Sequence, residues 1–386
     1  MNEESLKYWI ALRAVEEVGC VGFRTLLAAF GSPESVFRAP ASTLQVIPGI
    51  GPKTADHIRS FSDWEMAERE VARCGKLGVA IVTCEDPFYP VNLLNIYDYP
   101  PFLYVLGSLC ANEIGVAIVG SRLASAFGKY ITEKLSRELA MQGITVVSGL
   151  ARGIDSAAHR GALAGKGRTI AVLGCGLDVL YPPENESLAA EITAHGALVT
   201  EFPFRTPPNA PNFPARNRII SGIALGVVVV EAGEKSGSLI TARIASEQGR
   251  SVFAVPGAIE SAGSRGTNRL IKQGAKLIEN VEDILEEILP QAGLPRTHPE
   301  QLPLISTPAA IQGEPHTAPA SLPAKALGLG ETESKLLSFI THEPVDVDTL
   351  IAVSGLTAHE VQGSLLVLEL GEIIRRLPGK LFLRKE

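Results

Sequence analysis

Short apolar runs alternate with amphipathic stretches through the middle of this 386-residue chain. Residues 116–119 and 144–147 are apolar runs rich in β-branched side chains, which is typical of strands buried in a parallel sheet. Between them, residues 124–141 repeat apolar positions at helical spacing, and Gly143 follows where a helix needs a left-handed residue to end. The pattern predicts a strand, a helix and a second parallel strand.

The same alternation continues on both sides of this unit. Further strands are predicted at residues 79–82, 102–107, 169–176, 197–201, 226–231, 251–257 and 275–278. Helices fit between them at residues 155–164, 186–195, 216–224, 238–248 and 267–274. Strands and helices that alternate at this spacing predict an α/β fold with a doubly wound, mostly parallel sheet.

The N-terminal part, residues 1–75, has only helical patterning. Residues 47–55 match the turn of a helix-hairpin-helix motif, in which Gly49 and Gly51 would expose backbone N–H groups to a DNA phosphate beside Lys53. A single hairpin lacks the partner that usually completes such a unit. A hairpin that only packs inside the domain is therefore an equal alternative.

The C-terminal part divides into two segments. Residues 290–330 are rich in Pro, Ala, Thr and Gln and lack periodicity, which predicts a flexible linker. Residues 331–386 predict a winged helix with three helices and a hairpin around Pro378 and Gly379. The predicted domains are therefore 1–75, 76–289 and 331–386, with the linker between the last two.

Composition narrows the class of protein. The chain has no apolar run long enough to cross a bilayer, and its N-terminus does not resemble a signal peptide, so we expect a cytoplasmic protein. Its five cysteines form no CxxC pair, which argues against a zinc site, and we expect no metal and no cofactor. The net charge of −7 argues against non-specific coating of nucleic acid, but cations exceed acids in residues 112–170.

Two turns are the first candidates for chemistry. Both predicted strands of the opening unit end in small residues followed by an arginine, at the sheet edge where α/β proteins bind ligands. Small residues let backbone N–H groups approach an anion, and arginine adds planar donors suited to phosphate. The candidate residues are Gly120, Ser121, Arg122, Ser148, Gly149, Arg152 and Gly153.

Two later stretches extend the predicted anion site. Phe213 is expected in a loop before a helix that starts with Arg216, Asn217 and Arg218, and an aromatic ring beside arginines can stack on a base while the arginines hold phosphate. A second helix is expected to open after Gly233. Its candidate residues are Ser236, Gly237, Ser238 and Thr241, which would form another anion cradle.

The sequence excludes several enzyme classes. Gly174 and Gly176 follow a strand, but prolines follow where a dinucleotide-binding helix would begin, and no phosphate-binding P-loop pattern occurs. Asp155 and His159 lie one helical turn apart, but no third residue is spaced to complete a triad. We therefore interpret Asp155 as a helix cap.

These motifs together resemble the DprA/Smf (DNA-processing protein A) family. They are Val-Gly-Ser-Arg at 119–122, Ser-Gly-Leu-Ala-Arg-Gly-Ile-Asp at 148–155, Phe-Pro-x-Arg-Asn-Arg-Ile-Ile at 213–220, Glu-Ala-x-x-x-Ser-Gly-Ser-Leu-Ile-Thr-Ala at 231–242 and Gly-Thr-Asn-x-Leu-Ile at 266–271. The ordered motifs run from about residue 89 to 288, and the flanking domains resemble those of the longer members.

The resemblance implies a function and assigns roles to residues. It implies an extended Rossmann-like fold without catalytic activity, and a homodimer that binds single-stranded DNA during natural transformation. Such a protein protects incoming strands and loads the RecA recombinase onto them. Arg122 would grip a phosphate, and Phe213 and its neighbouring arginines would line the same pocket. This chain has Ala210 where the family often has a lysine, and Arg205 is a candidate to replace it.

Two other readings remain open. A nucleoside-monophosphate hydrolase of the lysine-decarboxylase-like class shares the sheet type and a glycine-rich phosphate turn, but that class needs a glutamate where this chain has Thr241. The third reading is a scaffold that binds a partner protein through the winged helix.

Overall fold

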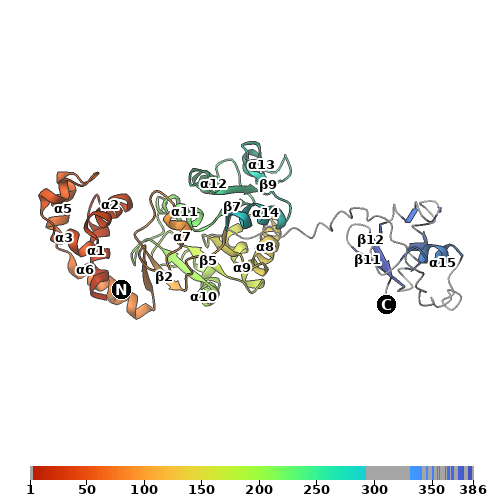
Figure 1. Ribbon diagram of the computed structural model, residues 1–386, viewed down its shortest axis with the longest axis horizontal. Helices are drawn as coiled ribbons and strands as arrows, with labels where there is room; N and C mark the ends of the chain where they lie inside the picture. The colour runs from red at the N-terminus through yellow and green to blue at the C-terminus, as the bar shows by residue number, and fades with distance from the viewer. Residues whose placement is uncertain are drawn as a thin grey trace, which may run out of the picture. The chain divides into compact units, whose positions relative to one another are not determined.

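The structure is a computed structural model, and it describes residues 3–292, 331–340, 345–346, 350–351, 354, 356, 361, 363–365, 367–368, 373–377 and 381–384 (Figure 1). The chain divides into two compact units, Met1–Leu302 and Pro303–Glu386. Each unit is described by itself.

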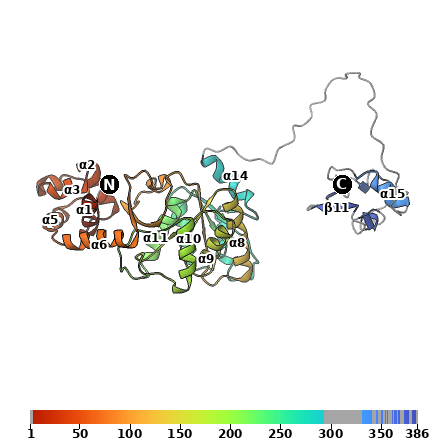
Figure 2. The same cartoon turned by 90° about the horizontal axis from the view of Figure 1, so that it is seen from below.

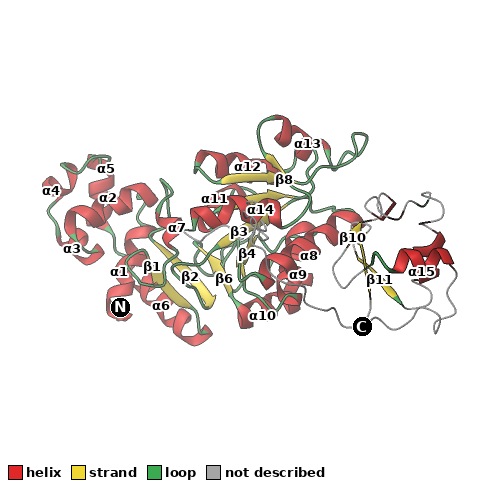
Figure 3. Ribbon diagram, turned by 45° about the vertical axis from the view of Figure 1, so that its right-hand side comes forward, coloured by secondary structure: helices red, strands yellow, loops and turns green. Residues whose placement is uncertain are grey.

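A nine-stranded sheet forms the centre of the first unit, with strand order β1-β2-β6-β5-β4-β3-β7-β8-β9 (Figure 3). The strands are β1 (Ala80–Thr83), β2 (Phe102–Gly107), β3 (Gly115–Val119), β4 (Thr145–Ser148), β5 (Thr169–Val172), β6 (Ala197–Thr200), β7 (Gly226–Val229), β8 (Ser251–Ala254) and β9 (Lys276–Leu277). The pairs β1–β2 and β2–β6 are antiparallel, and the remaining pairs are parallel. The predicted mostly parallel sheet is confirmed.

Helices cover both faces of this sheet (Figures 1 and 2). They are α7 (Val91–Leu94), α8 (Ala126–Met141), α9 (Ile154–Ala164), η1 (Pro183–Asn185), α10 (Glu186–His195), α11 (Asn212–Ile223), α12 (Gly237–Glu247), α13 (Arg265–Lys272) and α14 (Glu282–Gln291). One apolar core includes side chains of α8, α9 and α14, and another includes those of α7, α11 and α12. Because the central strands are buried on both faces, they read in the sequence as continuous apolar runs.

One helix starts earlier than the sequence pattern predicts. Helix α11 begins at Asn212, and Phe213, expected in a loop, lies in its first turn. Pro214 is compatible with this start because the N–H groups of a first turn have no partner inside the helix. The arginines of this helix therefore lie in its second turn and not at its N-terminus.

Six helices precede the sheet and pack against its β1–β2 edge. They are α1 (Glu3–Ala14), α2 (Cys20–Phe30), α3 (Pro33–Arg38), α4 (Ala41–Gln45), α5 (Pro52–Ser60) and α6 (Trp64–Leu77). Their core is continuous with the sheet, because Trp9 and Phe23 belong to the same buried cluster as Phe102 and Tyr104 of β2. The predicted all-helical N-terminal part is confirmed.

In the second unit, α15 (Glu331–Leu337) is described together with the strands β10 (Val345–Asp346), β11 (Ile374–Leu377) and β12 (Leu381–Arg384). The strands form one sheet in the order β10-β12-β11. Leu336, Val361 and Ile374 share a buried core. Most of the linker predicted at 290–330 and the turn at 378–380 lie outside the described residues.

Candidate functional site

The turn after β3 is held by close backbone contacts. A Cβ atom on Gly120 would lie 2.6 Å from Cγ1 of Ile154, so only glycine fits there. The Ser121 N–H donates to the Glu231 carbonyl oxygen over 2.7 Å, and the Ser121 carbonyl accepts from the Ile154 N–H over 3.2 Å. These contacts fix the turn between the ends of β3 and β7 and the start of α9, and they leave Arg122 exposed at the rim.

The second predicted turn, after β4, supports the first. Gly153 has a φ of 78°, and a Cβ atom there would lie 2.2 Å from the Ser121 carbonyl oxygen. A Cβ atom on Gly149 would lie 2.2 Å from Nη1 of Arg216. Both glycines are therefore required by close approach to neighbouring groups.

Two guanidinium groups lie near the aromatic ring of Phe213 on helix α11. The Cζ atom of Arg122 lies 5.1 Å from the centre of the Phe213 ring, and the Cζ atom of Arg216 lies 5.9 Å from it. Arg216 is only 4% exposed, and its Nη1 donates to the carbonyl oxygens of Gly149, over 2.8 Å, and Val172. Arg216 thus ties α11 to the carboxyl ends of β4 and β5, whereas Arg122 is exposed.

The start of α12 faces the same space. Ser236 caps this helix, and its Oγ accepts from the Ser238 N–H over 3.4 Å and lies 2.7 Å from the Ser238 Oγ. The N-terminus of an eleven-residue helix favours an anion, because its first N–H groups lack intrahelical partners. Thr241 lies one turn further on and is buried.

These elements enclose a pocket of about 610 Å³, called here the Arg122 pocket. Ten of the predicted site residues line it, namely Gly120, Ser121, Arg122, Phe213, Arg216, Asn217, Ser236, Gly237, Ser238 and Thr241. The described lining also includes Leu123, Lys235 and Asp155, which the prediction did not assign to the site. Lys235 lies inside the motif at residues 231–242, and its charge next to a helix start was the signal that could have found it.

The electrostatics of the Arg122 pocket favour an anion. Among its described lining residues, Arg122, Arg216 and Lys235 are cations and Asp155 is the single acid. Burial raises the pKa of Asp155 above its ordinary value and lowers that of Arg216, and the attraction between the two groups opposes both shifts. Among the described residues the lining contains neither histidine nor cysteine, and it has Thr241 where the hydrolase interpretation expects a glutamate.

Five predicted site residues lie outside the pocket lining. Ser148 Oγ donates to the Ile118 carbonyl oxygen over 2.6 Å, and Arg152 forms an ion pair with Glu184. Gly149 and Gly153 have the packing roles given above. Arg218 is the fifth. Arg205, the candidate to replace the family lysine, is exposed and is also absent from the lining.

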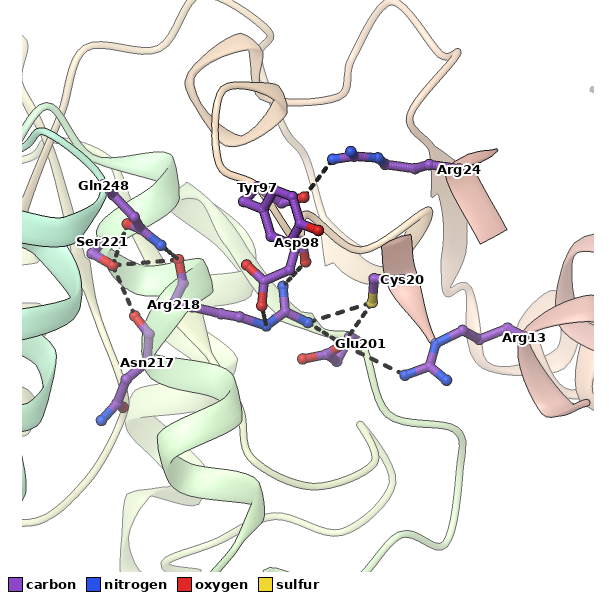
Figure 4. Close-up of polar contacts among 10 residues, drawn as sticks. All are labelled: Arg13, Cys20, Arg24, Tyr97, Asp98, Glu201, Asn217, Arg218, Ser221 and Gln248. Carbon is purple, nitrogen blue, oxygen red and sulfur yellow. Dashed lines mark hydrogen bonds and ion pairs between the residues drawn. The ribbon is translucent and has the colours of Figure 1, made fainter. Parts of the chain in front are cut away.

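Arg218 does not line the Arg122 pocket and instead points toward Glu201 and Asp98 (Figure 4). Its Nη2 lies 2.6 Å from Oε2 of the buried Glu201, and its Nε lies 3.3 Å from Oδ2 of Asp98. Residues two positions apart on a helix are separated by about 200° of rotation, so Arg216 and Arg218 lie on opposite sides of α11. Arg13 of α1 also approaches Glu201, at 3.9 Å, so this cluster joins α11 to the N-terminal helices.

Asp155 and His159 make separate contacts, and the interpretation of Asp155 as the helix cap was wrong. Asp155 accepts from the Ala151 N–H over 3.4 Å, in the first turn of α9, whose N-cap is Gly153. His159 instead bonds Thr169. Among the described residues no cluster of His, Cys, Asp and Glu could hold a metal ion, and no described helix is long and apolar enough to cross a membrane.

The helix-hairpin-helix turn has the expected glycines. Gly49 has a φ of 83°, and Gly51 caps α5, while Lys53 is paired with Glu17. Helix α2 likewise begins at a glycine cap, Gly19. The repeated glycine cap was the sequence signal for a second hairpin, which the prediction missed.

Comparisons with family models cover most of the chain. The model of the DNA recombination-mediator protein A family matches residues 80–289, and the DprA winged helix domain matches residues 317–380. A SAM-like helix-hairpin-helix tandem matches residues 10–61. The single hairpin of the prediction was therefore wrong in number, because the matching model is a tandem.

Individual relatives agree with the family models. Protein Smf of Synechocystis sp. is 35% identical over 100% of both chains. Protein Smf of Escherichia coli is 44% identical over 78% of this chain and 76% of its own length. The X-ray structure of DNA processing protein A from Streptococcus pneumoniae superposes with a TM-score of 0.63 at 35% identity, covering 73% of this chain and 98% of that chain.

The predicted resemblance is therefore confirmed, as is the fold class with its flanking helical and winged-helix domains. Recombination mediators act on DNA without catalysing a reaction, which confirms the prediction of a non-enzymatic protein. The chain belongs to the DNA recombination-mediator protein A family, also called DprA/Smf.

Proposed function

We propose that this protein binds single-stranded DNA in the Arg122 pocket. The observation that carries the proposal is the convergence of an exposed guanidinium, an aromatic ring 5.1 Å from it and the start of α12. A phosphate would bind Arg122 and Lys235 at the α12 N-terminus, and its base would stack on Phe213. A stacked duplex base cannot reach that ring, so single strands are preferred.

The family supports a proposal for the cellular role. We propose that the protein protects incoming strands during natural transformation, loads RecA recombinase onto them, acts as a homodimer and works in the cytoplasm. A binding protein that recognises phosphate and base faces without reading base edges suits this role, because it accepts any sequence. Sedimentation velocity tests the dimer, and RecA-dependent strand pairing on protein-coated DNA tests loading.

The direct test of DNA binding is a gel shift with the purified full chain. Single-stranded and duplex DNA of equal length and sequence are compared, with Arg122→Ala as the pocket variant. We expect the wild-type protein to shift the single strand at much lower concentration than the duplex. Equal affinity for both forms, or no shift of either, would overturn the proposal.

The domain limits are part of the proposal. We propose domains at residues 1–75, 76–289 and 331–386, with the linker at 290–330 and a DNA contact at Gly49, Gly51 and Lys53. Limited proteolysis should cut first between residues 290 and 330, because a linker lacks the packing that protects backbone. A first cut inside 76–289 would contradict these limits.

A further inference from the structure

Helix α8 exposes an unusual face. Phe127, Tyr130 and Met141 are 61%, 64% and 70% exposed, and Lys134 and Arg137 lie between them in sequence and are also exposed. These five residues are spaced by three or four positions, so they share one side of the helix and form what we call the α8 stripe. A solvent-facing helix side normally carries polar residues, and large exposed side chains in a row mark a binding surface.

The α8 stripe begins at the Arg122 pocket. Leu123, which lines the pocket, is 93% exposed and lies four residues before Phe127. Helix α8 starts at Ala126 and ends at Met141, so the stripe from Phe127 to Met141 runs for about 21 Å at 1.5 Å per residue. A chain molecule that leaves the pocket past Leu123 therefore meets the stripe directly.

Cations from the neighbouring helix complete this surface. Helices α8 and α9 lie side by side (Figure 3). A hollow of about 270 Å³ between them is lined by Tyr130, Lys134, Arg137 and, from α9, Arg160. Among the described residues neither Arg137 nor Arg160 forms an ion pair, and Lys134 lies 4.0 Å from Glu138. Of the described residues that line the hollow, Glu133 is the one acid.

The chemistry of the α8 stripe fits a single nucleic acid strand. Such a strand alternates phosphates with flat bases, and the surface alternates cations with aromatic rings. We propose that single-stranded DNA leaving the Arg122 pocket continues along α8, where Phe127 and Tyr130 stack on bases and Arg137 and Arg160 bind phosphates. This inference rests on the proposed function, because the strand must first occupy the pocket.

The test compares two lengths of DNA. Fluorescence anisotropy measures the affinity of the full chain for oligodeoxythymidine of about 4 and about 16 nucleotides, the range of site sizes in single-strand binding folds. Wild-type protein should bind the longer strand more tightly. The double variant Phe127→Ala with Tyr130→Ala should lower the affinity for the longer strand by about tenfold or more, because each stacked base contributes about tenfold or more to affinity. Its affinity for the shorter strand should be unchanged.

A charge variant and a control complete the design. Arg137→Ala with Arg160→Ala should lower the log–log salt slope of the long strand by about 1.4, the single-strand value for two phosphates. Phe88→Ala is the matched control, because Phe88 is 62% exposed and lies off the stripe and pocket. Phe88→Ala should change neither the affinity for the short strand nor the affinity for the long strand. All substituted side chains are exposed, so thermal unfolding should be unchanged.

The outcomes separate the two proposals. Wild-type protein could bind the short strand through Arg122 and bind the long strand no more tightly, or both stripe variants could keep the higher affinity for the long strand. Either result would show that the strand path along α8 is wrong, and the proposal for the Arg122 pocket would be unaffected. If the stripe variants instead shift the protein between oligomeric states with DNA affinity unchanged, the stripe contacts a second copy of the chain and the inference is overturned. If neither length binds, both proposals fall.

Discussion

The guanidinium of Arg122 is exposed at the pocket rim, and among the described residues it forms no ion pair. Arg122→Ala should therefore remove one charge-assisted phosphate contact of about 1.5–3 kcal/mol, which is about tenfold or more in affinity. The loss should be the same for different base sequences, and the salt slope should fall by about 0.7. Titrations at several salt concentrations measure both effects. Wild-type affinity in a folded variant would contradict the prediction.

Phe213 should behave differently from Arg122, although the Arg122 Cζ atom lies only 5.1 Å from the centre of the Phe213 ring. Phe213→Ala removes a stacking surface and no charge, so we expect a loss of about 1–3 kcal/mol in binding with little change in the salt slope. The same titrations distinguish the variants. An equal fall in slope for both would mean that the ring acts mainly by positioning the Arg122 guanidinium, and the assigned base contact would be wrong.

His159 makes the stability of the protein depend on pH. Thr169 Oγ1 donates its hydrogen to the Val146 carbonyl over 2.7 Å, so His159 Nδ1, also 2.7 Å away, donates to Thr169. The Nε2 atom is buried and has no partner among the described residues. Burial, reinforced by the Arg216 charge, lowers the pKa of His159 to about 3.

The sign of this effect follows from proton uptake. Below about pH 6.5 the histidine of the unfolded chain binds a proton, whereas His159 in the folded protein does not. As the pH decreases, the free energy of unfolding should therefore fall by up to about 1.4 kcal/mol per pH unit, until the pH reaches the pKa of the folded state. Urea unfolding at about pH 7 and about pH 5 measures the slope. His159→Gln should make the slope shallower, and an unchanged slope would contradict the assignment.

Two arginines on opposite sides of helix α11 hold this helix in place. Arg216 bonds the strand ends, and Arg218 pairs with Glu201 and Asp98 toward the N-terminal helices (Figure 4). Arg218→Ala leaves the buried Glu201 carboxylate without its nearest cation, so the free energy of unfolding should fall by about 3–5 kcal/mol. The measurement is the urea midpoint of unfolding.

Two comparisons make this prediction specific. Lys53→Ala breaks an exposed ion pair with Glu17 in the same unit and should leave the urea midpoint nearly unchanged. Arg218→Met combined with Glu201→Leu should recover much of the loss, because a buried pair can be replaced by apolar packing. If Arg218→Ala were as mild as Lys53→Ala, the cluster would not hold α11 in place.

Helices and strands could be predicted from the sequence where a single physical rule determines the local structure. The buried strands β3, β4 and β7 are continuous apolar runs, and parallel strands bring their carboxyl ends to one edge, so the meeting of Arg122 with α12 was predictable. The start of α11 was missed because prolines flank Asn212 and suggest a loop. Which of Arg216 and Arg218 faces the pocket depends on the rotation of the helix against the sheet, and the sequence pattern does not give that rotation.

For the whole molecule, the described lining of the Arg122 pocket lies entirely within the first unit. Its lining runs from Val119 to Thr241, inside the stretch of residues 80–289 that matches the recombination-mediator model. The six N-terminal helices share a core with β2 and so stabilise the same unit. The match to a DprA winged helix domain, residues 317–380, lies beyond this stretch.

A chain that ends at Ala292 should therefore keep its affinity for single-stranded DNA. The sequence from 357 to 370, where a recognition helix would lie, carries Glu360 and Glu369 and no lysine or arginine, and a helix in the major groove normally needs cations for the phosphates. We expect the truncated and full chains to agree within about threefold, less than 1 kcal/mol, in anisotropy titrations with the same oligonucleotide. Circular dichroism of the truncated chain checks that the first unit still folds. A folded truncated chain that no longer binds would place the principal DNA contact in the winged helix, and the cations of the wing, such as Arg384, would become the residues to substitute next.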